Sequence, residues 1–279
     1  MTQTRRYSEL DVFTPKPLLG NPLAVVHDGR GLSDAQMAAF ARWTNLSETT
    51  FLLPPTRPEA DYKVRIFTPE RELPFAGHPT LGSCHAWLSA GGQPRNASEV
   101  IQECGVGLVR VRRDGARLAF AAPPLKRTGP LEPDLLARIV RGLGLQPDEV
   151  VDHQWVDNGP GWCAVRLPSA ARALELKPDY AQLRGLSLGV VAAHPAGDEA
   201  QFEVRALIGR GPGYEDPVTG SLNASLAQWL IGAGVAPAQY VAAQGAALKR
   251  AGRVHVQRID ADTWIGGDVC EVVAGTVQL

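Results

Sequence analysis

ELPFAGHPTLGSCHAWLSAGG, the stretch from Glu72 to Gly92, joins a tight turn to an apolar segment. Its Gly-His-Pro corner, Gly77–Pro79, precedes a run of mostly apolar residues that ends in two glycines. Proline is typical of the first turn of a helix, and glycine is typical of the position after the last turn. Because the predicted helix has no clear polar face, we expect it to lie inside the protein.

A similar stretch occurs in the second half of the chain. AWLSAGG (Ala86–Gly92) resembles QWLIGAG (Gln228–Gly234), and a glycine corner precedes each, at Gly77-His78 and at Gly220-Ser221. This similarity suggests an internal duplication. The simplest architecture that buries both helices is an α+β fold with two pseudo-symmetric domains, each a curved sheet wrapped around a central helix.

Local patterns predict the elements around these two helices. Ser33 and Gln36 form a capping signal for an amphipathic helix with Phe40 and Trp43 on one face, and Asp114-Gly115 predicts a hairpin turn. The second half contains a predicted strand, GWCAVRLP, and a predicted short helix around KPDYAQLRGL. We place a domain boundary near residue 122, which gives domains of residues 1–122 and 123–279.

The composition favours a soluble enzyme that acts on small molecules. The chain has 279 residues, is 44% hydrophobic and carries a formal net charge of -1, which argues against binding to nucleic acid or to an anionic membrane. No apolar run approaches the length of a membrane span, and the N-terminus has no signal-peptide core. The four cysteines show no disulfide or metal-ligand spacing, which predicts free thiols and a cytoplasmic location.

The two helix starts predict an anion site. The first N–H groups of a helix have no carbonyl partner within the helix, and the positive end of the helix dipole lies beside them. If both starts face a cleft between the domains, together they bind a carboxylated or enolising substrate.

Several ordered blocks resemble the phenazine-biosynthesis-like (PhzF-like) family. The blocks are GNPLAVV, NLSETTFLLPP, FTPERELPFAGHPTLG, YEDPVTGSLNASLAQWL and AQGAALKRAGRVHV. The resemblance implies a diaminopimelate-epimerase-like fold with the active site between two domains, and a C-terminal segment that can return to the first domain. It also implies proton transfer without a cofactor on a small carboxylated molecule, as in dihydro-hydroxyanthranilate isomerisation, and a homodimer.

The resemblance also assigns roles to individual residues. Glu48 matches the glutamate that acts as general acid and base, while His78 and Asp216 match groups that position the substrate and assist proton delivery. Related epimerases carry a cysteine pair at the two glycine corners, where this chain has Ala76 and Thr219. A two-thiol racemase mechanism is therefore disfavoured. Three further positions match substrate-binding sites in the family, namely Gly77, Gly220 and Ser221.

Each of these residues also has a purely structural interpretation. Glu48 alone could be a solvated acid at a strand edge, and His78 and Ser221 could cap helices. Asp216 could belong to a turn with Pro217, and Asn21 is interpreted as a turn residue that alternatively lines the cleft.

Other combinations of residues do not predict a site. Adjacent helical residues such as Cys84 and His85 point in different directions, which favours a buried thiol over a nucleophile and base. No metal site is predicted from His78 and His85, because no further ligand stands at a suitable spacing.

Two other functions remain as alternatives to the isomerase. An epimerase or racemase would exchange a proton at one stereocentre without moving a double bond. A non-catalytic protein would bind a small metabolite in the same cleft, but the glutamate of the SETTF block is present, which favours the enzyme.

Overall fold

The computed structural model describes residues 2–279. The chain forms two compact units. Unit 1 runs to Ala121 and also includes Gly266–Leu279, while unit 2 is Ala122–Ile265. No helix in residues 2–279 is long and apolar enough to cross a membrane.

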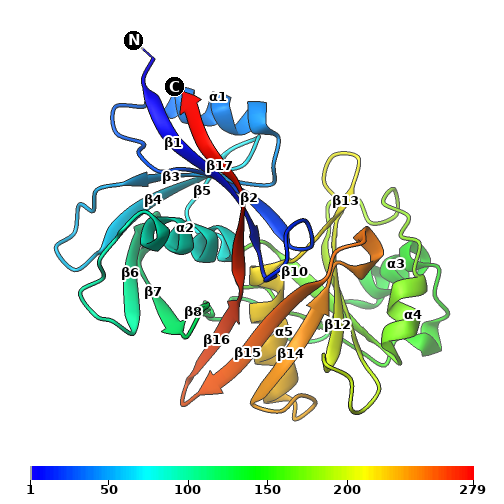
Figure 1. Ribbon diagram of the computed structural model, residues 1–279. Coiled ribbons are helices and arrows are strands. Elements are labelled where there is room, and N and C mark those ends of the chain that lie inside the picture. Colours follow the sequence, from blue (N-terminus) through cyan, green and yellow to red (C-terminus); the bar gives the residue numbers. More distant parts are fainter. Residues whose placement is uncertain (1) are drawn as a thin grey trace. The chain divides into compact units, whose positions relative to one another are not determined.

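Unit 1 is built on one strongly curved sheet (Figure 1). In the order of pairing, the strands are β17 (Val269–Gln278), β1 (Thr4–Val12), β2 (Asn21–Val26), β3 (Thr49–Leu53), β4 (Tyr62–Phe67), β6 (Glu99–Cys104), β7 (Gly107–Asp114) and β8 (Arg117–Ala121). The short β5 (Glu72–Leu73) pairs with the other end of β4. Only the β2–β3 and β4–β6 pairs are parallel among these.

The apolar helix of the first half is α2 (Gly77–Ser89), and the strands of unit 1 surround it. The helix approaches β2 closely at Gly82, where a Cβ atom would lie 2.4 Å from the Leu23 side chain. A larger residue at position 82 would therefore force the Leu23 side chain to move. The expectation of a buried central helix in the first half is confirmed.

A second helix, α1 (Asp34–Thr44), covers another part of the unit 1 sheet. The predicted capping box is present, with Ser33 and Gln36 each bonded to the backbone of the other. Phe40 packs into a cluster with Val26, Phe51 and Phe67. Trp43 was expected on the same buried face, but it is 79% exposed and stacks on Phe40.

Unit 2 repeats this order of elements. Its strands are β9 (Asp152–Trp155), β10 (Trp162–Leu167), β11 (Ser187–Ala193), β12 (Phe202–Ile208), β14 (Gln239–Gln244) and β15 (Gly252–Ile259), with β13 (Tyr214–Asp216) on the other end of β12. The parallel pairs are β10–β11 and β12–β14. They correspond to β2–β3 and β4–β6 of unit 1. One further strand, β16 (Asp262–Gly267), begins in unit 2 and ends in unit 1, whose second segment starts at Gly266.

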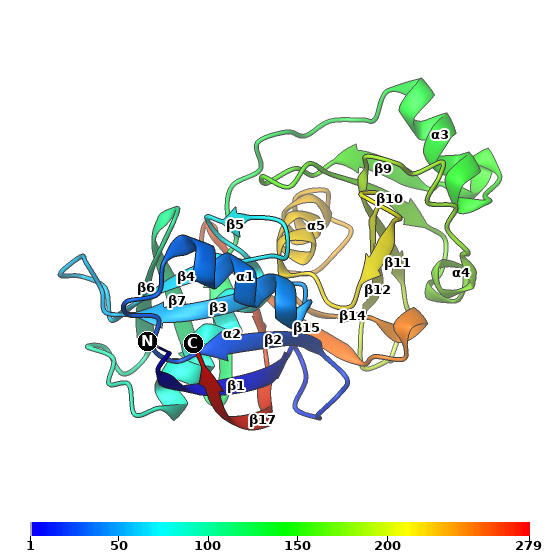
Figure 2. The same ribbon diagram turned by 90° about the horizontal axis from the view of Figure 1, so that it is seen from above.

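The central helix of unit 2 is α5 (Gly220–Gly232), which Figure 2 shows inside the curve of β10, β11 and β12. In this unit the glycine at the close contact between helix and sheet lies on the strand. A Cβ atom at Gly189 of β11 would lie 2.6 Å from the Leu222 side chain of α5. The matching order of strands and helices confirms the pseudo-symmetric α+β architecture. The remaining helices of unit 2 are α3 (Pro133–Leu143), α4 (Ala170–Glu175) and the 3-10 turns η1 (Pro147–Glu149) and η2 (Ala246–Leu248).

One predicted helix is absent from its expected place. The KPDYAQLRGL segment forms turns, in which Asp179 Oδ1 accepts bonds from the N–H groups of Ala181 and Gln182. The helix of this region is α4, and it begins earlier because Ser169 caps it by accepting from the N–H of Arg172. A short aspartate side chain that bonds the backbone ahead of it competes with helix formation.

The two ends of the chain meet in unit 1. β17 pairs antiparallel with β1 from Val12↔Val269 to Thr4↔Gln278. Leu279 and Gln3 exchange two further backbone hydrogen bonds, and Figure 2 shows both ends side by side. The last strand therefore returns to the unit that contains the first.

Candidate active site

Glu48 lies in the short connection between α1 and β3 of unit 1. Asn45 adopts the left-handed conformation (φ 56°) that ends α1. The chain then enters β3 at Thr49, which is completely buried. Glu48 is thereby held at the edge of the core, with 15% of its side chain exposed.

His78 is the second residue of α2, and its side chain faces Glu48. Its Nε2 atom lies 3.4 Å from Glu48 Oε2, and the histidine is 5% exposed. Within residues 2–279 this Nε2 atom is buried and forms no hydrogen bond. The structure therefore brings together the two unit 1 side chains that the resemblance singled out.

Asn21 contacts the other nitrogen of the His78 ring. Asn21 Nδ2 lies 3.4 Å from His78 Nδ1, and Ser47 Oγ donates to Asn21 Oδ1 at 3.4 Å. The prediction of a turn residue is wrong, because Asn21 is the first residue of β2 and is completely buried. A polar residue at the start of an apolar strand was the available signal for this contact.

The imidazole of His78 is uncharged at neutral pH. Burial lowers the pKa of His78 to about 3, and a hydrogen bond to the Pro22 carbonyl opposes part of this shift. The ring therefore presents a neutral donor or acceptor to Glu48, not a positive charge.

The start of α2 has no side-chain cap. Its N-cap residue is Ala76, so the structural interpretation of His78 as the cap is wrong. Gly77 and His78 provide N–H groups that no carbonyl within the helix can reach, while Pro79 has none. These two N–H groups and the helix dipole form a positive end that suits an anion.

Asp216 is the last residue of β13, in unit 2. Its neighbour Glu215 points to the opposite face of the strand, where it forms a buried ion pair with Arg205 at 2.7 Å. Asp216 Oδ2 accepts a hydrogen bond from Thr219 Oγ1 at 2.5 Å. The strand that carries Asp216 is thus anchored on one face and bonded on the other.

Gly220 and Ser221 are the first two residues of α5. Thr219 is the N-cap, so the structural interpretation of Ser221 as a cap is wrong. Ser221 Oγ accepts from Trp162 Nε1 at 3.1 Å, and its carbonyl accepts from Asn158 Nδ2 at 3.0 Å. These bonds fix the first turn of α5, where no side chain caps the N–H groups.

The cysteines do not supply a nucleophile. All four are free. Burial raises the pKa of Cys84 and of Cys163 to about 12, so neither is a thiolate at neutral pH. Across residues 2–279 no cluster of three or more histidine, cysteine, aspartate or glutamate side chains could hold a metal ion.

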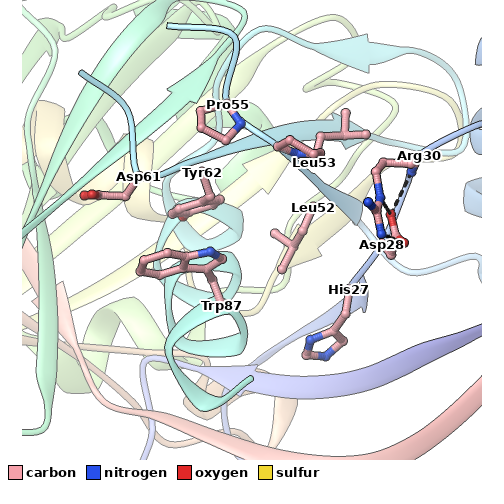
Figure 3. Close-up of a pocket in the computed structure, with 10 residues that line it drawn as sticks. His27, Asp28, Arg30, Leu52, Leu53, Pro55, Asp61, Tyr62 and Trp87 are labelled. Carbon is pink, nitrogen blue, oxygen red and sulfur yellow. Dashed lines mark hydrogen bonds and ion pairs between the residues drawn. The ribbon is translucent and has the colours of Figure 1, made fainter. Parts of the chain in front are cut away.

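A recess of about 260 Å³ lies elsewhere on unit 1. Figure 3 shows the stacked rings of Tyr62 and Trp87 on one side of it and the ion pair of Asp28 and Arg30 on the other. None of the candidate residues of unit 1 lines this recess.

Comparison with known proteins identifies the family. The model of the phenazine biosynthesis-like proteins (PhzC-PhzF) matches residues 10–269. An uncharacterised isomerase from Mesorhizobium japonicum is 40% identical over 244 residues, which cover 81% of this chain and 80% of that protein. Trans-2,3-dihydro-3-hydroxyanthranilate isomerase from Pseudomonas chlororaphis is 35% identical over 228 residues, which cover 79% and 78%.

Solved structures support the same conclusion about the fold. A crystal structure of a PhzF-family protein from Enterococcus faecalis has a TM-score of 0.83 and covers 99% of this chain and 100% of its own, at 23% identity. At that identity the likeness shows the fold alone, and it confirms the fold that the sequence blocks implied. With the family model matched over nearly the whole chain, this protein belongs to the PhzF-like family of isomerases.

Proposed function

We propose that this protein moves a proton between two carbon atoms of a small carboxylated substrate, with Glu48 as the general acid and base. The observation that carries this proposal is the placement of Glu48 Oε2 3.4 Å from the buried, uncharged His78 ring. A carboxylate at the edge of an apolar core is partly desolvated, which favours its use in proton transfer.

The neutral ring of His78 leaves Glu48 effective as a base. A protonated histidine beside Glu48 would stabilise the carboxylate and weaken it as a base, whereas the neutral ring does not. Buried polar atoms are nearly always hydrogen-bonded in folded proteins, so the unbonded His78 Nε2 suggests a position kept for a substrate group.

The substrate carboxylate and the charge that develops during the reaction require donors. We assign this role to the N–H groups at Gly77 and Gly220, because both helices begin without a side-chain cap. Asp216 and Ser221 position the substrate in the proposed reaction. No bound cofactor is needed for these steps. The homodimer and the cytoplasmic location stay predictions.

The named relative supplies the first substrate to test, trans-2,3-dihydro-3-hydroxyanthranilate. The protein is incubated in D2O with this compound and with a panel of small amino and hydroxy acids. Deuterium incorporated at carbon is then measured by mass spectrometry. Glu48→Gln is compared with the wild type and with Glu70→Gln, which changes an exposed acid of the same unit.

We expect the wild type and Glu70→Gln to label one compound and Glu48→Gln to label none. The labelled carbon separates an isomerase from an epimerase, because an epimerase exchanges only at the stereocentre that it inverts. Equal labelling by Glu48→Gln and the wild type would exclude Glu48 as the base.

A further inference from the structure

Gln244, the last residue of β14, forms four hydrogen bonds at the start of α5. It is 1% exposed. Its Nε2 atom donates to the Asp216 carbonyl at 3.1 Å and to Thr219 Oγ1 at 3.0 Å. Its Oε1 atom accepts from the Thr219 N–H at 3.0 Å and from Asn223 Nδ2 at 2.8 Å. A primary amide has two donor hydrogens and two acceptor positions, so Gln244 is fully used.

This arrangement fixes the orientation of the Gln244 amide. The reverse orientation would place the NH2 group against the Thr219 N–H and the Asn223 NH2 group, which are both donors. Asn223 is itself held by a second bond, from its Nδ2 to the Thr219 carbonyl at 2.9 Å. The polar network around Thr219 is therefore closed and has one consistent set of hydrogen positions.

The orientation of Gln244 determines where the Thr219 hydroxyl points. Threonine at an N-cap normally bonds to an N–H group of its own helix, but Thr219 makes no such bond. Its oxygen accepts from Gln244 Nε2, and its single hydrogen is directed to Asp216 Oδ2 at 2.5 Å. A hydroxyl that donates to a carboxylate stabilises the ionised form.

We propose that Gln244 is a positioning residue that acts on Asp216 through Thr219. The Gln244 amide holds the backbone of Asp216 by one hydrogen and turns the Thr219 hydroxyl to the Asp216 carboxylate by the other. Asp216 is thereby kept ionised and in a single orientation for the substrate. This inference rests on the role of Asp216 in the proposed function.

Unit 1 offers a matched control at Gln102. This residue is also a completely buried glutamine on the strand that follows the central helix, and it too bonds to the fourth residue of that helix. Its Nε2 atom donates to Thr80 Oγ1 at 3.1 Å, and its Oε1 atom accepts from Tyr62 at 2.7 Å. Thr80 donates onward to a backbone carbonyl, at Ala76, and no carboxylate takes part.

The test is a pH titration of Asp216, observed by NMR on protein that contains aspartate labelled with 13C at Cγ. The Asp216→Asn variant assigns the Asp216 resonance. Wild type, Gln244→Met and Gln102→Met are compared. We expect Gln244→Met to raise the pKa of Asp216 by about one unit, because the hydroxyl is no longer directed at the carboxylate. Gln102→Met should leave this pKa unchanged. The Gln244→Asn variant keeps an amide, but its side chain is one methylene shorter. It should also raise the pKa of Asp216.

An unchanged titration of Asp216 in a folded Gln244→Met variant overturns the proposal. If Gln244→Met does not fold, Gln244→Asn decides in the same way. The titration needs no substrate, so its result is independent of the proposed function. Where the wild type exchanges a proton with a substrate, Gln244→Met should lower kcat by about tenfold with KM unchanged, and a rise in KM alone contradicts the proposal.

Discussion

The starts of α2 and α5 occupy corresponding places in the two units, yet they carry different polar groups. At α2, His78 faces Glu48 across 3.4 Å and meets Asn21 at the same distance. At α5, Asp216 and Thr219 belong to a network with bonds of 2.5 to 3.1 Å. The same backbone corner therefore occurs in both units with different side chains.

The two corners leave their helix starts uncapped for different reasons. Ala76 has no polar group to offer, whereas the Thr219 hydroxyl is used by Asp216 and Gln244. Both solutions leave the first N–H groups of the helix without a side-chain partner. A positive helix end can therefore be kept open either by a residue with no capping group or by a capping group that bonds elsewhere.

The corners also differ in the groups that face their carboxylates. Glu48 faces a buried nitrogen with no hydrogen bond, which suits a group that must exchange a proton. Asp216 is fixed by a hydroxyl, a buried amide and an ion pair on the preceding residue, Glu215. We therefore expect Glu48 to do the proton transfer and Asp216 to orient the substrate.

The largest predicted effect is on the rate of deuterium incorporation, and it differs between changes to Glu48 and changes to Asp216. Glu48→Gln should lower the rate of deuterium incorporation by about 10²–10⁴-fold, which is the usual contribution of a general base. Asp216→Asn should lower it by about tenfold to a hundredfold, because it disturbs orientation alone. Both rates are measured with the substrate that the wild type labels. The reverse order of effects would assign the base to unit 2.

The next prediction compares Thr219→Val with Thr80→Val. Each change keeps the shape of the side chain and removes the acceptor of a buried glutamine, so each should lower the free energy of unfolding by about 1–3 kcal/mol. Urea unfolding measures this cost. Only Thr219→Val should also slow proton exchange, since only Thr219 bonds to a carboxylate. Equal loss of exchange in both variants would mean that instability alone explains it.

A smaller effect concerns the pH dependence of stability. The pKa of His78 is about 3 in the folded protein and about 6.5 when unfolded, so the unfolded chain binds more protons between these values. Stability is therefore lost as the pH falls below 6.5. Between pH 7 and pH 5.5 the contribution of His78 should be about 1 kcal/mol.

The His78→Gln variant tests this contribution. Urea unfolding at the two pH values should show a weaker pH dependence in the variant than in the wild type. Burial also lowers the pKa of His27 and His85, so the variant keeps part of the dependence. An unchanged dependence would show that the pKa of His78 in the folded protein equals its value in the unfolded chain.

The smallest predicted effect comes from a substitution that adds a capping hydroxyl at the start of α2. Ala76 has the extended backbone (φ −152°, ψ 143°) of an N-cap, so the hydroxyl in Ala76→Ser can accept from the His78 N–H. Stability should rise by about 0.5–1 kcal/mol, while substrate binding weakens because the hydroxyl takes one of the two N–H groups, those of Gly77 and His78, that form the positive end of α2. Thermal unfolding and substrate titration measure the two effects. Ala90→Ser, at the other end of α2, is the control and should change neither.

The sequence predicted most elements because their signals are local. The capping box of α1 and the hairpin at Asp114-Gly115 depend on residues a few positions apart. The same reasoning failed at KPDYAQLRGL, where the Asp179 side chain bonds to the backbone and replaces a helix by turns. The site residues Glu48, His78 and Asp216 were named from the ordered family blocks, and their roles stay predictions.

The sequence alone predicted the similarity of the two halves, the two buried helices and the resemblance to the family. The polar groups that meet at the starts of these helices became known from the three-dimensional structure. Asn21 reaches His78 across 57 positions of the chain, and Gln244 reaches Thr219 across 25. Such contacts depend on how strands pair and how a helix packs into the curve of its sheet. Local patterns do not encode that register, because each residue's partner is set by elements far away in the chain.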